Sequence, residues 1–200
     1  MKTAFLTIFT ALILATGIAN TTFASTTKNQ EFTVLTDISA INKIEVYGNV
    51  QLFISDGSAD QVKVYNKYYA EGALVQSRNG VLRISSYNTQ KLVVWVTAAD
   101  LHAISAYDNA EVKSFGNISK IEFEVDLHNN ASAKLNIDAF SATVTLNDNA
   151  KADLSGSAND LSLQHSVSSS VNSYNFSAVH YTERKTGIPV EVKNEDIAIL

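Results

Sequence analysis

The chain has 200 residues, of which 46% are hydrophobic and 18% are charged, which predicts one folded domain rather than a disordered chain. The net charge of −5 and the lack of a basic run argue against nucleic acid or an anionic membrane as a partner. Because cysteine is absent, disulfides, thiolate metal sites, a cysteine nucleophile and the lipid anchor of a bacterial lipoprotein are excluded.

The N-terminus has the pattern of a secretory signal. Lys2 precedes an apolar run over residues 4–18, and Thr22-Phe23-Ala24 fits a small-x-small cleavage site. We expect residues 1–24 to be a Sec-type signal peptide and residues 25–31 a flexible mature N-terminus. A membrane anchor is the competing interpretation, but the run is short for a span of ~20 residues. The sequence therefore predicts export to the periplasm, cell surface or medium, without membrane insertion after cleavage.

Beyond residue 31, apolar residues alternate with polar ones in short runs, the pattern of strands. Examples are Val94 and Val96, or Val125 and Leu127. No helical pattern of useful length follows the signal, so the predicted class is all-β.

A five-residue frame recurs in the C-terminal half: an apolar residue, three turn-forming residues and a small apolar residue. It occupies residues 106–110, 127–131 and 146–150, with a blurred copy at 167–171, and its last residues are offset by 21, 19 and 21. This period predicts a right-handed parallel β-solenoid, or β-helix, over residues 32–182, with coils of about 20 residues. The first residue of each frame, Val167 included, is expected to point inward.

The frame also matches residues 46–50, sixty residues before 106–110, which predicts two intermediate coils. Tyrosine then recurs at one corner of successive coils, and His128 continues the column. The predicted aromatic ladder consists of Tyr47, Tyr65, Tyr87 and Tyr107.

One segment resists this scheme. Asn79-Gly80 stands between apolar residues and predicts a hairpin. We interpret this segment either as a hairpin inserted between coils or as part of an antiparallel sheet over residues 32–97 that leads into a shorter solenoid, which is the fold alternative. Residues 183–200 are rich in charge up to residue 196 and are expected to form a C-terminal cap or strand, since an exposed solenoid end is a strand edge.

Several segments resemble the auto-transporter adhesin head domain, also called the GIN domain. They are residues 44–54 and 62–64, Asn79-Gly80-Val81-Leu82-Arg83-Ile84, Val94-Trp95-Val96-Thr97 followed by Leu101, and the repeats from 104 to 171. The resemblance spans roughly residues 32–177. It implies a secreted or surface β-protein with an adhesin role, and it carries no catalytic residues. The chain departs from the family's Ser-Gly corners, because Asp-Asn, Asn-Asn and Ser-Ser stand there instead.

The tyrosine column is the candidate ligand site, because aromatic rings beside amide and carboxylate groups suit a glycan. The predicted contacts are Tyr47, Tyr65, Tyr87, Tyr107, Asp108 and Asn109. The competing interpretation is that like residues simply stabilise the stacking of coils. Asp108 and Asp148 share a corner column with Asn129, where turn chemistry is favoured over a calcium site.

No catalytic residue, metal site or cofactor is predicted. The four histidines lack metal-ligand spacing, and His165 is expected to be buried and neutral. The sequence therefore favours a non-enzymatic binding module for a glycan or surface protein, and an oligomer is compatible with it. The alternatives are a polysaccharide-degrading β-helix enzyme and a structural module that assembles with itself.

Overall fold

The computed structural model describes residues 32–36, 38, 40–65 and 72–187, and these contain strands, turns and loops but no helix. The predicted signal peptide, residues 1–24, lies outside the described residues, as do residues 25–31 and 188–200. Among the described residues, no helix long and apolar enough to cross a membrane is found. The all-β class predicted from the sequence is confirmed.

Thirteen strands are described, and short strands precede long ones. The short strands are β1 (Thr33–Leu35), β2 (Lys43–Gly48), β3 (Val50–Asp56), β4 (Gln61–Val64), β5 (Ala73–Arg78), β6 (Val81–Ser86), β7 (Leu92–Ala98), β8 (Ala103–Ala106) and β9 (Glu111–Ser114). The long strands are β10 (Ile118–Leu127), β11 (Ser132–Leu146), β12 (Lys151–Ser166) and β13 (Ser170–Thr186).

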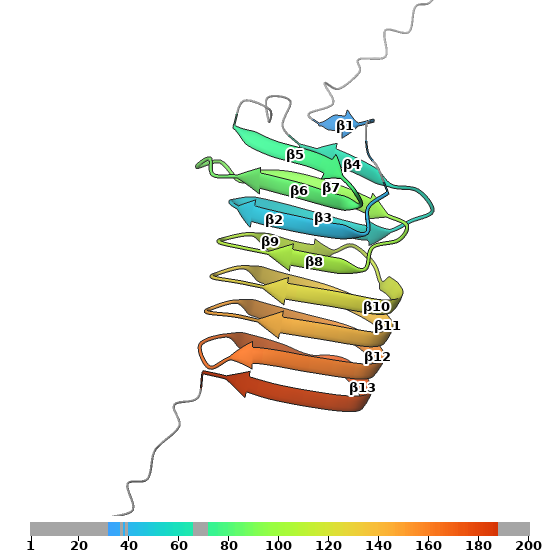
Figure 1. Ribbon diagram of the computed structural model, residues 1–200, viewed down its shortest axis with the longest axis vertical. Coiled ribbons are helices and arrows are strands. Elements are labelled where there is room, and N and C mark those ends of the chain that lie inside the picture. Colours follow the sequence, from blue (N-terminus) through green and yellow to red (C-terminus); the bar gives the residue numbers. More distant parts are fainter. Residues whose placement is uncertain (1–31, 37, 39, 66–71, 188–200) are drawn as a thin grey trace, which may run out of the picture. The chain divides into compact units, whose positions relative to one another are not determined.

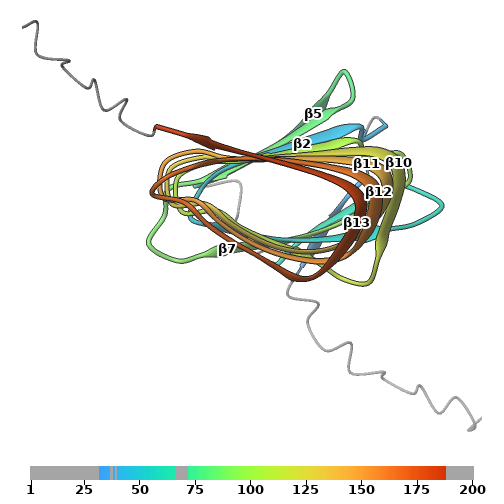
Figure 2. The same cartoon turned by 90° about the horizontal axis from the view of Figure 1, so that it is seen from below.

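All thirteen strands belong to one curled sheet, in the order β1-β4-β7-β3-β9-β11-β10-β8-β2-β6-β5, with β12 and β13 beyond β11. The sheet curls because β11 bends around one edge. Its first residues pair with β9 and its last residues with β10. Figures 1 and 2 show the resulting stack of flattened turns along its side and from below.

The stack has two broad outer surfaces. We call the outward side of β6, β2, β8 and the later parts of β10, β11 and β12 the Tyr47 face. We call the outward side of β4, β7, β3, β9 and the early parts of β11 and β12 the Trp95 face. Residues 107–109, 128–130 and 147–149 turn the chain from the first face to the second.

Parallel pairing with a constant offset builds the C-terminal part. Val125 pairs with Ile104 on one side and with Val144 on the other, and Val144 pairs with Leu163. These side chains are buried, so equivalent apolar residues of successive turns stack inside the sheet. The offsets of 21, 19 and 19 residues agree with the period read from the sequence.

The order of turns differs from the order of the chain. Strand β2 pairs with β6 on one side and with β8 on the other. The turn made by β2 and β3 therefore lies between the later turns β6–β7 and β8–β9. The predicted two intermediate coils between residues 46–50 and 106–110 are wrong, because these segments are direct neighbours.

The sheet is mixed, so the predicted parallel β-solenoid is confirmed only as an all-β fold in which most strand pairs are parallel. Three pairs are antiparallel: β1–β4, β4–β7 and β5–β6. The hairpin β5–β6 turns at Asn79 and Gly80, whose φ angles of 51° and 80° fit the predicted two-residue turn. The antiparallel alternative for residues 32–97 is also incomplete, since β2–β6 and β3–β7 in that region are parallel.

The blurred fourth frame is displaced by two residues from its predicted position. Leu146 pairs with His165, whereas Val167 is 60% exposed and does not point inward. The predicted inward position of Val167 is therefore wrong, since His165 occupies the equivalent site. Of the predicted cap, residues 183–186 belong to β13, and residues 188–200 lie outside the described residues.

Candidate functional site

Three rings stack at the corner where the Tyr47 face ends. The centroids of Tyr47 and Tyr107 are 4.6 Å apart with 4° between planes, and those of Tyr107 and His128 are 4.6 Å apart with 9°. Arg83 lies 6.0 Å from the Tyr47 ring centroid at one end, and Asn147 Nδ2 lies 3.4 Å from His128 Nδ1 at the other. Neighbouring groups thus contact the ring faces along this stack, which favours a role in holding the turns together.

Tyr87 lies beside this stack without belonging to it. Its side chain is 73% exposed, and its hydroxyl donates a hydrogen bond to Asp108 Oδ2 at 3.1 Å. Partial desolvation and this hydrogen bond raise the pKa of Tyr87. Asn109 follows Asp108 and is exposed. We call Tyr47, Tyr87, Tyr107, Asp108 and Asn109 the corner cluster.

Tyr65, the remaining predicted contact, is not at this corner. It follows β4 on the Trp95 face, where its ring centroid lies 6.4 Å from that of Trp95. The predicted four-tyrosine ladder is therefore incomplete: only Tyr47 and Tyr107 stack. The reason is the antiparallel direction of β4, which removes Tyr65 from the column.

Acidic and amide side chains at the corner serve the backbone turns. Asp108, Asn129 and Asp148 have φ angles of 60°, 58° and 55°, a region that Asn and Asp tolerate better than most residues. Asn129 Oδ1 accepts a hydrogen bond from the Asp108 N–H, and Asp148 Oδ2 accepts one from the Asn129 N–H. Each turn thus binds the next, which supports turn chemistry over a calcium site. No metal-binding group of three or more His, Cys, Asp or Glu is found among the described residues.

A charged cluster adjoins the ring stack on the Tyr47 face. Arg83 Nη2 lies 2.7 Å from Glu45 Oε2, the Tyr47 hydroxyl donates to the same oxygen, and Lys43 Nζ lies 3.5 Å from Glu45 Oε1. Burial opposes ionisation of Glu45, but these partners outweigh it and hold its pKa below the usual value. Burial and the Glu45 charge raise the pKa of Tyr47. The cluster is a network in which two cations, Lys43 and Arg83, share the carboxylate of Glu45.

Each histidine lies beside one carboxylate. His165 is buried, as predicted, and its Nε2 lies 2.8 Å from Glu183 Oε1. The other pairs are His102 with Asp100, His128 with Asp126, and His180 with Asp160. The pairs of His165 and His180 both join β12 to β13, whereas His102 and His128 each pair with a carboxylate two residues earlier in the chain.

A second aromatic group, not predicted from the sequence, covers part of the Trp95 face. Trp95 stacks on Phe53 with centroids 4.7 Å apart, and Phe115 lies 5.4 Å away on the same tryptophan. Phe32 lies 5.3 Å from Tyr65 and extends the group. We call Phe32, Phe53, Tyr65, Trp95 and Phe115 the aromatic patch. The alternation of residues along each strand indicates that Phe53 and Trp95 point outward. Their proximity depends on the pairing of β3 with β7, which the sequence does not reveal.

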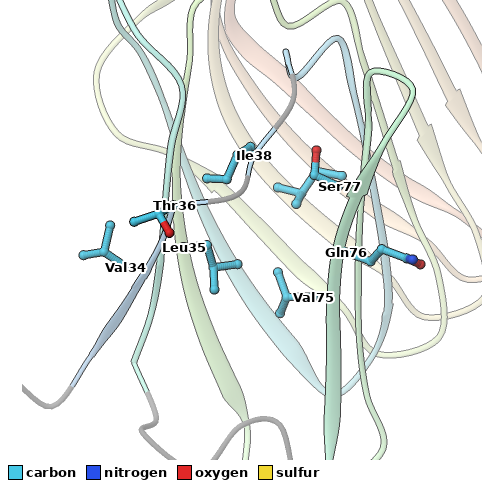
Figure 3. Close-up of a pocket in the computed structure, with 8 residues that line it drawn as sticks. Val34, Leu35, Thr36, Ile38, Val75, Gln76 and Ser77 are labelled. Atoms are coloured by element: carbon cyan, nitrogen blue, oxygen red, sulfur yellow. The ribbon is translucent and has the colours of Figure 1, made fainter.

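A cleft of about 440 Å³ with both apolar and polar lining residues opens at the β1 and β5 end of the stack. Figure 3 shows Leu35, Ile38 and Val75 facing one another across it, and the buried Leu82 also lines it. The cleft exists because β5 diverges from the opposite side of the stack, as Figure 2 shows.

A curled, mixed β-sheet with turns of about twenty residues places the chain among β-proteins built by stacking successive turns on one another. Residues 40–187 match the family model described as "Putative auto-transporter adhesin, head GIN domain". The chain belongs to this family, which makes it an adhesin-like surface domain.

Solved structures with the same fold come from Bacteroides and Parabacteroides species. A putative adhesin from Bacteroides fragilis has a TM-score of 0.64 at 12% identity, covering 80% of this chain and 78% of that one. A protein from Parabacteroides distasonis named a putative lipid binding protein has a TM-score of 0.55 at 10% identity, covering 74% and 75%. A putative adhesin from Parabacteroides merdae has a TM-score of 0.51 at 13% identity, covering 80% and 79%. No curated protein matches the chain.

Proposed function

We propose that this protein is a secreted or surface-exposed, non-enzymatic adhesin that binds a glycan or a surface protein. The observation that carries the proposal is the exposed Tyr87 ring, held by Asp108 of the adjacent turn. An aromatic ring fixed beside hydrogen-bonding groups is the combination that a sugar requires. Within the corner cluster, Tyr87, Asp108 and Asn109 supply the contacts while Tyr47 and Tyr107 hold the turns in place, and Tyr65 belongs to the separate aromatic patch.

The scaffold suits this role if the parallel region is a right-handed β-solenoid. The in-register pairs of β10, β11 and β12 support that assignment, and right-handedness is the rule for parallel crossovers. Such a stack keeps surface side chains at the regular strand spacing of ~4.8 Å, so little entropy is lost when an extended ligand binds. Export through residues 1–24 would place the module at the cell surface or in the medium.

The charged cluster at Glu45 is the observation that would favour a polysaccharide-degrading enzyme. Proton abstraction requires a base whose pKa lies near the working pH. The pKa of Tyr47 is raised further above neutrality, and Glu45 is held ionised by Arg83. These directions favour a structural ion pair over an acid–base pair, so we retain the non-enzymatic proposal.

Two other roles have an observation in their favour. The apolar side chains of Leu35, Ile38 and Val75 in the cleft favour binding of a lipid acyl chain, in keeping with the name of the Parabacteroides distasonis protein. The exposed Tyr174 and Val179 on β13 suit a self-assembling structural module, because β13 is an edge strand. Binding of a fluorescent fatty acid, lost in Val75→Trp, tests the first. Sedimentation of the unaltered chain tests the second.

The corner cluster is tested by a binding screen against glycans and outer-surface proteins with the variants Tyr87→Ala and Asp108→Asn. The proposal predicts a ligand whose affinity falls about tenfold in Tyr87→Ala, the loss expected for one aromatic contact. Tyr174→Ala is the matched control, since Tyr174 is also exposed but lies on β13. Equal binding by Tyr87→Ala and the unaltered protein to every captured ligand would contradict the proposal.

A further inference from the structure

The Trp95 face joins exposed aromatic rings to positive charge. Phe115 and Tyr65 are 64% and 41% exposed on either side of Trp95. Lys63 Nζ lies 5.7 Å from the Phe32 ring centroid, and Lys113 Nζ lies 5.9 Å from that of Phe53. Exposed aromatic patches of this kind mark binding surfaces in soluble proteins.

The charges of the two faces differ in sign. On the outward positions of the Trp95 face there are five lysines, Lys63, Lys91, Lys113, Lys134 and Lys151, against two acids, Glu111 and Asp153. This is an excess of three positive charges in a chain whose net charge is −5. The Tyr47 face carries five acids, Glu45, Glu122, Glu124, Asp126 and Asp160, against two bases, Lys43 and Arg83, which is an excess of three negative charges. A polyanion approaching the protein is therefore directed to the Trp95 face.

From these two observations we infer that the Trp95 face binds an anionic glycan, whose carboxylate or sulfate groups contact the lysines while its sugar rings contact the aromatic patch. The inference rests on the proposed adhesin function and names the ligand class. It places the ligand on a different surface from the corner cluster.

The arrangement of the patch suits an extended polymer. Trp95, Phe53 and Lys113 lie on three adjacent strands and at paired positions, because Phe53 pairs with both of the others. Lys134 continues the same row on β11, paired with Lys113. A chain of acidic sugars lying across the strands would meet aromatic rings first and then successive ammonium groups. Lysine provides a flexible point charge for such contacts rather than a fixed bidentate geometry.

The test is surface plasmon resonance with the purified protein against polygalacturonate, heparin, neutral dextran and phosphatidylglycerol vesicles. The test variants are Phe115→Ala and the double variant Lys63→Gln/Lys113→Gln. Phe140→Ala is the aromatic control, because Phe140 is 61% exposed on β11 outside the patch. Lys43→Gln is the charge control, because Lys43 lies on the Tyr47 face and its side chain is 40% exposed, close to the 41% of Lys113 on the Trp95 face.

We expect saturable binding to at least one of the two anionic glycans that weakens with added salt. Phe115→Ala and the double lysine variant should each weaken it about tenfold, and both controls should leave it within about twofold. Binding of an anionic glycan that is lost in Tyr87→Ala but not in these variants would overturn this inference and leave the proposed function intact. Binding only to dextran, only to vesicles or to none of the probes would also overturn it.

Discussion

The rings of Tyr47 and Tyr107 stack with their centroids 4.6 Å apart, although sixty residues separate them in the chain. This contact follows from the pairing of β2 with β8, whose Val46 and Ala106 are direct partners. Of the strands between these two tyrosines in the chain, β6 and β7 pair with the other side of β2 and β3. Strands β5 and β4 lie farther out, beside β6 and β7. The stack therefore grows in both directions from its first turn, and the tyrosine pair joins the two parts.

Loss of the central ring should weaken the stack. Tyr107 contacts Tyr47 on one side and His128 on the other, so Tyr107→Ala removes two aromatic contacts. We expect it to lower the free energy of unfolding by about 1 to 2 kcal/mol, measured by urea denaturation. Tyr107→Phe keeps the ring and should stay within about 0.5 kcal/mol of the unaltered protein. Equal stability of the alanine and phenylalanine variants would show that the stack does not hold the turns.

The positive φ of the corner residues makes a second prediction. At Asn129 (φ 58°), a β-branched residue is strained and cannot accept the hydrogen bond from the Asp108 N–H. Asn129→Val should lower the free energy of unfolding by about 1 to 3 kcal/mol, measured by thermal or urea denaturation. Asn129→Gly should lower it by less. Asn130→Val at the next, exposed position is the control. If Asn129→Val lost less stability than Asn130→Val, the left-handed turn conformation assigned to Asn129 would be contradicted.

Gly156 should not tolerate a side chain. Its φ is 108°, and a Cβ there would lie 2.0 Å from the carbonyl oxygen of Ile137 on the neighbouring turn. Gly116 has φ 83° with nothing near the Cβ position, so Gly116→Ala measures the backbone strain alone. We expect Gly156→Ala to reduce stability by about 2 kcal/mol or more beyond Gly116→Ala. Similar losses at both glycines would mean that β11 and β12 separate there at no cost.

These corner features could be predicted from the sequence because they are local. Asp108, Asn129 and Asp148 recur at nearly equal spacing, and Asn79-Gly80 specifies its own turn. The order of the turns could not be predicted, because the partners of β2 are chosen by long-range packing. For the same reason the aromatic patch was missed: Phe53 and Trp95 are 42 residues apart, and only the pairing of β3 with β7 brings them together.

Acid should weaken the protein through Glu111. A hydrogen bond from Lys91 holds the pKa of Glu111 below 4.5 despite partial burial, and Lys113 adds to the effect. Since the folded pKa is lowered, this contribution to stability is complete above about pH 4.5 and is lost as the pH falls through the folded value. Urea denaturation at pH 7 and at pH 3 should show that the free energy of unfolding falls less for Glu111→Gln than for the unaltered chain. Lys91→Gln should reduce the loss in the same way, and an unchanged loss in both variants would contradict the pairing.

The most direct measurement for the central claim is a binding screen of the chain without its predicted signal peptide, residues 25–200, on an array of glycans and surface proteins. The screen is run with calcium and with chelator, and each captured polysaccharide is also assayed for cleavage. The account predicts saturable binding to at least one ligand, unchanged by the chelator and without cleavage. Cleavage of a bound polysaccharide, or no binding to any array component, would contradict the claim that this protein is a non-enzymatic adhesin.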